Sequence, residues 1–197
     1  GTQPFTSGPT YAGAIVMFLF IFGLLFVKSE MRVWILLATI MSIMLAWGKN
    51  FMPLTDLFLD YFPGYNKFRA VSMILVVAEF TLPLLGFVAL NTFLSTDSDE
   101  KKKPLNLAFY IVGGISLIFA LMPSLFFNFV GGQDANLAKN GWPIDALQAD
   151  RAGLLSADAW RSFTFIALTF GAMWMFLKNK ISTKYVILIV GVLVLAD

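Results

Sequence analysis

The sequence contains no cysteine and no histidine among its 197 residues. Without cysteine the chain can form no disulfide and offers no thiolate nucleophile or thiolate metal ligand, and without histidine it offers no imidazole base. Charged residues are also scarce, at 13% against about 25% in soluble domains. The formal net charge is only +2 and the basic residues are scattered, which excludes a nucleic-acid-binding surface.

Apolar residues dominate instead, since 58% of the chain is hydrophobic and the mean hydropathy is +0.78. A helix that crosses a bilayer needs roughly 17–25 largely apolar residues. Six segments meet or approach this requirement: 11–27, 33–47, 71–94, 107–127, 163–177 and 185–197. The sequence therefore predicts an all-α fold, a single polytopic transmembrane bundle of about six spans over residues 1–197. The start at Gly1 and the short last segment are typical of a piece of a longer protein.

The basic residues predict how these spans are oriented. One set of connections is short and rich in cations, namely Lys28, Arg32, Lys101, Lys102, Lys103, Lys178, Lys180 and Lys184. The opposite connections hold a similar number spread over longer segments. By the positive-inside rule the first set is cytoplasmic, so segments 48–69 and 128–162 face outward.

The first outer segment, 48–69, concentrates charge and aromatic rings. Pro53 suits the start of a helix, and the apolar residues 57, 58, 61 and 62 recur on one helix face, which predicts an amphipathic helix lying in the membrane interface. Such a helix needs no chemistry. A second interpretation is that Asp56 and Asp60, four residues apart, bind a divalent cation or act as acid–base groups.

Around these aspartates the segment also carries cations and a ring suited to a phosphorylated ligand. In the second interpretation Lys49, Lys67 and Arg69 hold a phosphate, with Tyr65 beside them. No metal site with a complete ligand set is predicted, and a divalent cation is the only cofactor that the pattern allows for.

Glu79 lies inside the third predicted span, ten residues beyond Arg69 and therefore about 15 Å along a helix. Pro83 cannot donate the hydrogen bond that the Glu79 carbonyl would accept, which predicts a kink. One interpretation is a site for an ion or substrate within the membrane; the other is a structural partnership with a polar residue of a neighbouring helix.

The second outer segment, 128–162, opens with a flexible turn, Gly131-Gly132-Gln133-Asp134, and Pro143 can start a helix. Ser156 is a candidate cap for the span that follows, and Arg151 and Arg161 are candidate phosphate ligands. Interfacial packing explains the same pattern. In the fourth span, Gly113-Gly114 indicates close helix packing.

Four runs of the sequence resemble the YfhO-like family of large bacterial membrane proteins, over essentially the whole chain. They are Gln3-Pro4-Phe5-Thr6-Ser7-Gly8-Pro9, Trp47-Gly48-Lys49-Asn50-Phe51, the stretch from Asp60 to Ser72, and Leu147-Gln148-Ala149-Asp150-Arg151-Ala152. The resemblance implies a glycosyltransferase of the GT-C type in the bacterial cytoplasmic (inner) membrane. Such an enzyme would transfer a sugar from a polyprenyl-phosphate carrier to a cell-envelope acceptor on the outer face.

The main catalytic acid of GT-C enzymes usually lies in the first outer loop of the complete chain, so the resemblance does not assign that role to Asp56 or Asp60. The expected partners are membrane lipid, the polyprenyl-phosphate sugar donor and the rest of the parent chain. Two other functions remain open. The chain could be a transporter or flippase-like module that uses Glu79, or a non-catalytic membrane scaffold.

Overall fold

The structure is a computed structural model that describes residues 11–63, 71–96 and 99–197. Within these ranges it consists of helices and contains no strand, which confirms the predicted all-α class. Each of the six predicted apolar segments overlaps a helix, although 163–177 is only the second half of its helix and 107–127 extends past the end of its helix. These are α1 (Ala14–Phe26), α2 (Glu30–Ala46), α4 (Leu75–Ser95), α5 (Lys102–Leu121), α7 (Ile144–Leu177) and α8 (Thr183–Ala196). The connections hold the short helices α3 (Met52–Tyr61) and α6 (Asp134–Lys139) and the 3-10 turns η1 (Gly48–Phe51), η3 (Val71–Ile74), η4 (Asp99–Lys101) and η5 (Pro123–Leu125).

Three helices are long and apolar enough to cross a membrane: Ser72–Ser95, which contains α4, and the helices α5 and α7. The helices α1 and α8 are apolar but shorter, with 13 and 14 residues. The chain therefore has the features of a membrane protein, but the predicted count of six spans is not confirmed.

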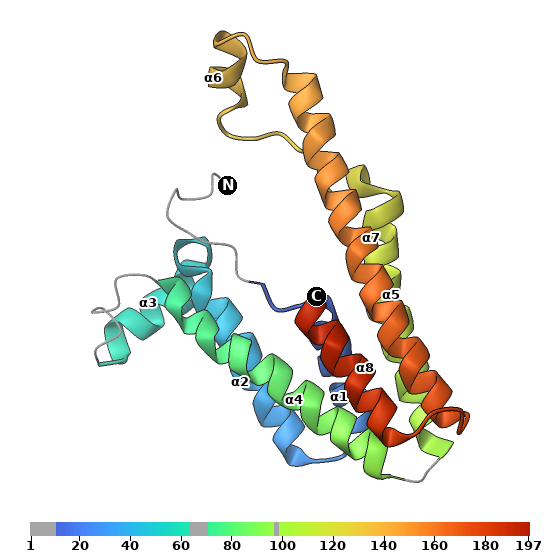
Figure 1. The fold of residues 1–197 in the computed structure, drawn as a ribbon. Helices are drawn as coiled ribbons and strands as arrows, with labels where there is room; N and C mark the ends of the chain where they lie inside the picture. The colour runs from blue at the N-terminus through green and yellow to red at the C-terminus, as the bar shows by residue number, and fades with distance from the viewer. Residues whose placement is uncertain (1–10, 64–70, 97–98) are drawn as a thin grey trace.

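The helices form two arms that spread apart from a common base (Figure 1). One arm pairs α2 with α4, and the other pairs α5 with α7. Helix α1 lies between them and packs against α4, α5 and α7, while α8 packs against α7 and α1. This central place follows from the composition of α1, whose 13 residues are apolar on every side.

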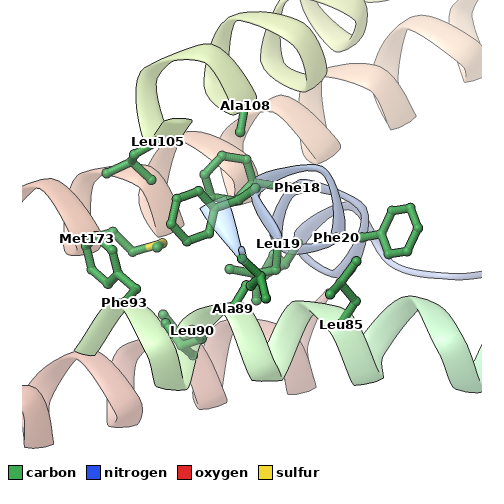
Figure 2. Close-up of a cluster of buried hydrophobic side chains, with 14 of the residues drawn as sticks. Phe18, Leu19, Phe20, Leu85, Ala89, Leu90, Phe93, Leu105, Ala108 and Met173 are labelled. Atoms are coloured by element: carbon green, nitrogen blue, oxygen red, sulfur yellow. The ribbon is translucent and has the colours of Figure 1, made fainter. Parts of the chain in front are cut away.

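The core is therefore built around α1 (Figure 2). Phe18 and Phe22 are fully buried, and the ring of Phe22 meets that of Phe93 edge to face at 5.6 Å between centroids. Glycine permits a close approach of α1 to α4. A Cβ atom on Gly23 would lie 3.0 Å from the backbone oxygen of Leu85, and one on Gly86 would lie 3.0 Å from the Cβ of Leu19.

The predicted glycine pair of the fourth span does not have this role. A Cβ atom on Gly114 would meet nothing within 4 Å, and one on Gly113 would meet only ordinary contacts. Helix α5 turns Gly114 away from its neighbours, so the prediction of close packing there is wrong for Gly114.

Hydroxyl groups join α2 to α4. The Ser42 hydroxyl donates to the Ile74 carbonyl at 2.6 Å and accepts from the Ala78 N–H at 3.3 Å. It therefore bridges a backbone carbonyl and an N–H four residues apart, which in a regular helix hydrogen-bond to each other directly. Thr39 and Thr81 share a buried hydrogen bond of 2.7 Å between their hydroxyl oxygens. Buried polar contacts of this kind are typical of helices that associate in lipid.

Three of the cation-rich connections meet at one end of the bundle, which we call the lysine end. Lys28, after α1, forms a 2.7 Å ion pair with Glu100 before α5. Lys101 is buried, with its ammonium 5.1 Å from the centre of the Phe93 ring and 5.5 Å from that of Phe176. The loops after α1, α4 and α7 therefore lie together, as their shared predicted side requires.

Candidate functional site

The turn η1 and helix α3 form a small platform at the far end of α2 from the lysine end (Figure 1). Helix α2 has 17 residues, which separates the platform from that end by about 26 Å. Pro53 occupies the first turn of α3, as predicted. The buried Thr55 fixes α3 to the preceding turn, because its hydroxyl donates to the Gly48 carbonyl at 2.9 Å.

Apart from Thr55, helix α3 is largely uncovered. Asp56 and Asp60 are exposed, and neither forms a hydrogen bond or ion pair with another described residue. Their spacing of four residues places them on one side of the helix. The aromatic rings of Phe58 and Phe62 stack at 5.3 Å between centroids, and Tyr61 is 80% exposed. The helix therefore offers two exposed carboxylates, without a partner among the described residues, beside an apolar surface.

The cations predicted to accompany these carboxylates are not placed by the structure. Lys49 belongs to η1, but its side chain lies outside the described part, and Tyr65, Lys67 and Arg69 lie outside the described residues altogether. Their meeting with Asp56 and Asp60 stays a prediction. Among the described residues, no group of three or more acidic side chains is arranged to hold a metal ion.

The second outer segment is held together by an ion pair. The Arg151 guanidinium donates to both carboxylate oxygens of Asp134, at 2.8 and 2.9 Å, and to the Phe129 carbonyl at 2.7 Å. The Gly131 N–H donates to Asp134 at 2.8 Å. The hydrogen bonds from Arg151, followed by that from Gly131, lower the pKa of Asp134 to about 2. Because Arg151 is already paired, it supports the connection before α7, residues 129–143, which we call the α6 hairpin, and it does not present a free phosphate site.

Ser156 is not the cap of a separate span, and that prediction is wrong. Helix α7 runs without a break from Ile144 to Leu177, over 34 residues, so the predicted helix after Pro143 and the predicted span 163–177 are one element. The Ser156 hydroxyl donates to the Ala120 carbonyl at 2.6 Å. That carbonyl lies in the last turn of α5, where backbone oxygens lack partners within the helix, and Ser156 supplies one.

A third polar group joins three separate elements. The Tyr11 hydroxyl donates to the Asp197 carboxylate at 2.8 Å, and the second oxygen of that carboxylate accepts from the Ile15 N–H at 3.0 Å. Arg161 donates from Nη2 to the Asp197 carbonyl at 3.0 Å and to the Tyr11 oxygen at 3.1 Å. The Asp197 carboxylate thus caps the N-terminus of α1.

This cluster was not predicted from the sequence. Arg161 and Tyr11 are 150 residues apart, and no local pattern indicates which helix ends meet. The cluster stands at the edge of a hollow of about 370 Å³ between α1, α5 and α7. The side chains around this hollow are mostly apolar, and they include Met17, Ile111 and Ile115.

Glu79 lies on the exposed face of α4, away from α1 and α2. It has no hydrogen bond or ion pair with another described residue, so neither the predicted internal cavity nor the predicted polar partner is formed within the described part of the chain. A charged side chain facing hydrocarbon costs about 2.5–3.5 kcal/mol at the centre of a span. Helix α4 continues without a break through Pro83.

No protein-family model, curated protein or solved structure matches the chain.

Proposed function

We propose that the chain is the membrane region of an integral membrane glycosyltransferase of the GT-C type. In this proposal six spans cross the bacterial cytoplasmic membrane, the lysine end is cytoplasmic, and the platform of η1 and α3 faces outward. The enzyme would take a sugar from a polyprenyl-phosphate carrier and transfer it to a cell-envelope acceptor.

The observation that supports this proposal is the state of the carboxylates on α3. Asp134 is occupied by Arg151 and Asp197 by Tyr11 and Ile15, whereas Asp56 and Asp60 have no partner among the described residues. Two exposed carboxylates next to aromatic rings suit a sugar, because carboxylates accept hydrogen bonds from hydroxyl groups and rings pack on apolar faces.

In the proposed site, Asp56 or Asp60 contacts the sugar hydroxyls or a divalent cation. Lys49, Lys67 and Arg69 neutralise the phosphate of the carrier, and Tyr65 forms part of the surface under the ligand. The lipid chain of the carrier would reach this platform from the bilayer, because α3 itself exposes apolar side chains such as that of Leu57, which can lie against lipid. The main catalytic acid belongs elsewhere in the parent protein.

Alanine substitution of the three cations in the full-length protein tests the proposal. Hydrogen bonds to charged groups contribute about 1.5–3 kcal/mol, so Lys49→Ala, Lys67→Ala and Arg69→Ala should each lower sugar transfer from a polyprenyl-phosphate donor about tenfold or more. Lys139→Ala is the matched control, because Lys139 is an exposed cation of the other outer segment. Unchanged transfer at equal expression would overturn the assignment.

The second candidate function is a transporter or flippase-like module. It is favoured by one observation: the carboxylate of Glu79, on a helix long enough to span the membrane, has no partner among the described residues. This function predicts that Glu79→Gln stops transport while Asp56→Asn and Asp60→Asn leave it unchanged. The glycosyltransferase predicts the reverse pattern for sugar transfer. If the chain is instead a non-catalytic scaffold, these substitutions should reduce the activity of the full-length protein only where they also reduce the amount of folded protein.

A further inference from the structure

Two hollows lie along the seam between α1 and α5. The first, of about 430 Å³, is at the lysine end and is lined by Leu25, Phe26, Lys28, Glu100, Lys103 and Pro104. The second is the hollow of about 370 Å³ described above, which Met17, Ile21, Ile111 and Ile115 help to line. Because the end of α1 and the start of α5 share the first hollow, the two helices are antiparallel, and the second hollow lies further along the same seam.

Exposed apolar side chains of α5 connect the two hollows. Leu107 is 47% exposed, Ile111 38% and Ile115 52%. Counted from Pro104, the intervals of three, four and four residues place these side chains on one face of the helix. The face from Pro104 to Ile115 is about 16 Å long, and one leaflet contributes about half of a hydrocarbon core of about 30 Å. We call the two hollows and this face the α1–α5 groove, and its length matches the depth of one leaflet.

The lysine end of the groove carries an excess of positive charge. Its connections, residues 27–32, 96–103 and 178–184, hold eight basic and four acidic residues. This count includes Asp97 and Asp99, whose side chains lie outside the described part, so the excess of four charges does not depend on where they lie. At the far end of the groove Arg161 stands beside Asp158 and Asp197 instead. The lysine end is therefore the end that suits an anionic headgroup.

Exposed aromatic side chains mark the lysine end as the level of lipid headgroups. Trp34, near the start of α2, is 70% exposed, and Tyr185, near the start of α8, is 61% exposed. Tryptophan and tyrosine are enriched where a membrane meets water. The first hollow therefore lies at the depth at which phospholipids carry their phosphates.

Within the first hollow, Lys28 and Lys103 are the cations that a phosphate would meet. The ion pair of Lys28 with Glu100 leaves room for a further partner, because the two side chains are 80% and 71% exposed and the ammonium has three donors. Exposed pairs of this kind contribute little to stability. The two lysines and Glu100 together carry one net positive charge, which matches the single negative charge of a phosphodiester.

We propose that the α1–α5 groove binds one anionic phospholipid from the leaflet at the lysine end. The phosphate lies between Lys28 and Lys103, and one acyl chain follows Leu107 and Ile111 towards the second hollow. A soluble phosphate compound would leave the apolar face uncovered, and a lipid without net charge would leave the positive charge of the lysine end unbalanced. This inference does not depend on the proposed glycosyltransferase activity, whose site is at the opposite end of the bundle.

A fluorophore in the groove tests whether it concentrates anionic lipid. The full-length protein, with no cysteine outside the labelled position, carries bimane at Leu107→Cys and is placed in phosphatidylcholine bilayers. A small fraction of the lipid is then replaced by phosphatidylglycerol or phosphatidylcholine with brominated acyl chains, which quench bimane on contact. Leu188→Cys is the control, because Leu188 is 61% exposed and both leucines lie five positions after the first residue of their helices.

At Leu107 we expect brominated phosphatidylglycerol to quench severalfold more strongly than brominated phosphatidylcholine at the same mole fraction, whereas at Leu188 the two should quench equally. Equal quenching at Leu107 would overturn the proposal in favour of ordinary bilayer lipid. The same preference at both positions would overturn it in favour of diffuse attraction to the lysine end. No quenching by either lipid would overturn it as well, because another part of the protein would then fill the groove.

Substitutions of the two lysines test where the phosphate lies. Lys28→Ala together with Lys103→Ala should abolish the preference for phosphatidylglycerol, and the corresponding pair of arginine substitutions should keep it, because a guanidinium also binds phosphate. Lys184→Ala is the matched control, since Lys184 is an exposed cation of the same end that does not line the hollow. A preference that survives the double alanine substitution, or that Lys184→Ala lowers as much, would overturn the assignment.

Glu100→Gln and a soluble competitor distinguish the anionic lipid from two other ligands. Removal of the Glu100 carboxylate should raise the preference for phosphatidylglycerol, because it removes a repulsion; a loss would show that Glu100 binds the ammonium of a zwitterionic headgroup and would overturn the proposal. Added glycerol 3-phosphate should leave the quenching at Leu107 unchanged. Competition by this compound would overturn the proposal in favour of a site for soluble phosphates.

Discussion

Replacing Gly23 by alanine should weaken the contact between α1 and α4, on which the core depends. The new methyl group would lie 2.9 Å from Leu85 Cγ, 3.0 Å from the Leu85 carbonyl oxygen and 3.2 Å from Ala89 Cβ. These separations are shorter than the preferred carbon contact of about 3.5–4.0 Å. A side chain can rotate away, but the carbonyl belongs to the backbone of α4, so the two helices must move apart. Overpacking of this kind costs about 1–3 kcal/mol.

The matched control is Gly171→Ala in α7, where a Cβ atom would meet nothing within 4 Å. Both substitutions gain the same helix preference of alanine over glycine, about 0.5–1 kcal/mol, so their difference isolates the overpacking. For a chain of this size that difference corresponds to roughly 2–12 °C in unfolding temperature, with Gly23→Ala the lower. Thermal unfolding in lipid nanodiscs, followed by calorimetry, measures it. Equal unfolding temperatures would refute the close approach of α1 to α4.

Two further predictions concern single polar contacts. The folded pKa of Asp134, about 2, lies below its usual value of 3.8, so the carboxylate stabilises its hairpin fully above pH 3.8, and this stabilisation is lost as the pH falls through about 2. As this stabilisation is lost, the hairpin should loosen and the fluorescence of Trp142 should change. The Asp134→Asn variant should show the changed fluorescence already at neutral pH, whereas the control Asp145→Asn should behave as the native chain. Ser42→Ala should lower the free energy of unfolding by about 0.6 kcal/mol or more, because the Ile74 carbonyl and the Ala78 N–H lose the hydroxyl between them. Chemical unfolding in mixed micelles tests this, with Thr164→Ala as control, and an unchanged value would contradict the bridging role.

The helices were predictable where composition alone determines them. A long apolar run bounded by polar residues, as in α4, determines both that the segment is a helix and where the helix begins and ends. The predicted span 71–94 accordingly agrees closely with the helix Ser72–Ser95. Helix α7 was harder. Its first half carries Asp150, Arg151 and Asp158, which break the apolar pattern although they do not break the helix, and the prediction divided one element into two.

Contacts between distant elements were not predictable. Arg151 and Asp134 were each noticed, but the sequence does not show that α6 folds back on α7, and so the phosphate role considered for Arg151 could not be weighed against an ion pair. The same holds for Tyr11, Arg161 and Asp197. At the platform of α3 the local prediction was better, because the effect of Pro53 and the spacing of Asp56 and Asp60 depend on nearby residues alone.

The length of α7 sets both the distance of the α6 hairpin from the lysine end and the direction in which the hairpin points around the helix axis. At about 1.5 Å and 100° per residue, one residue added between Arg151 and the lysine end would raise the hairpin slightly and swing it more than a quarter of the way around the helix axis. Only insertions of about seven residues, close to two full turns, make the hairpin point in nearly the same direction again, and they move it about 10 Å further from the lysine end. A hairpin that points in one direction can therefore stand only at a few discrete distances from the lysine end, about 10 Å apart.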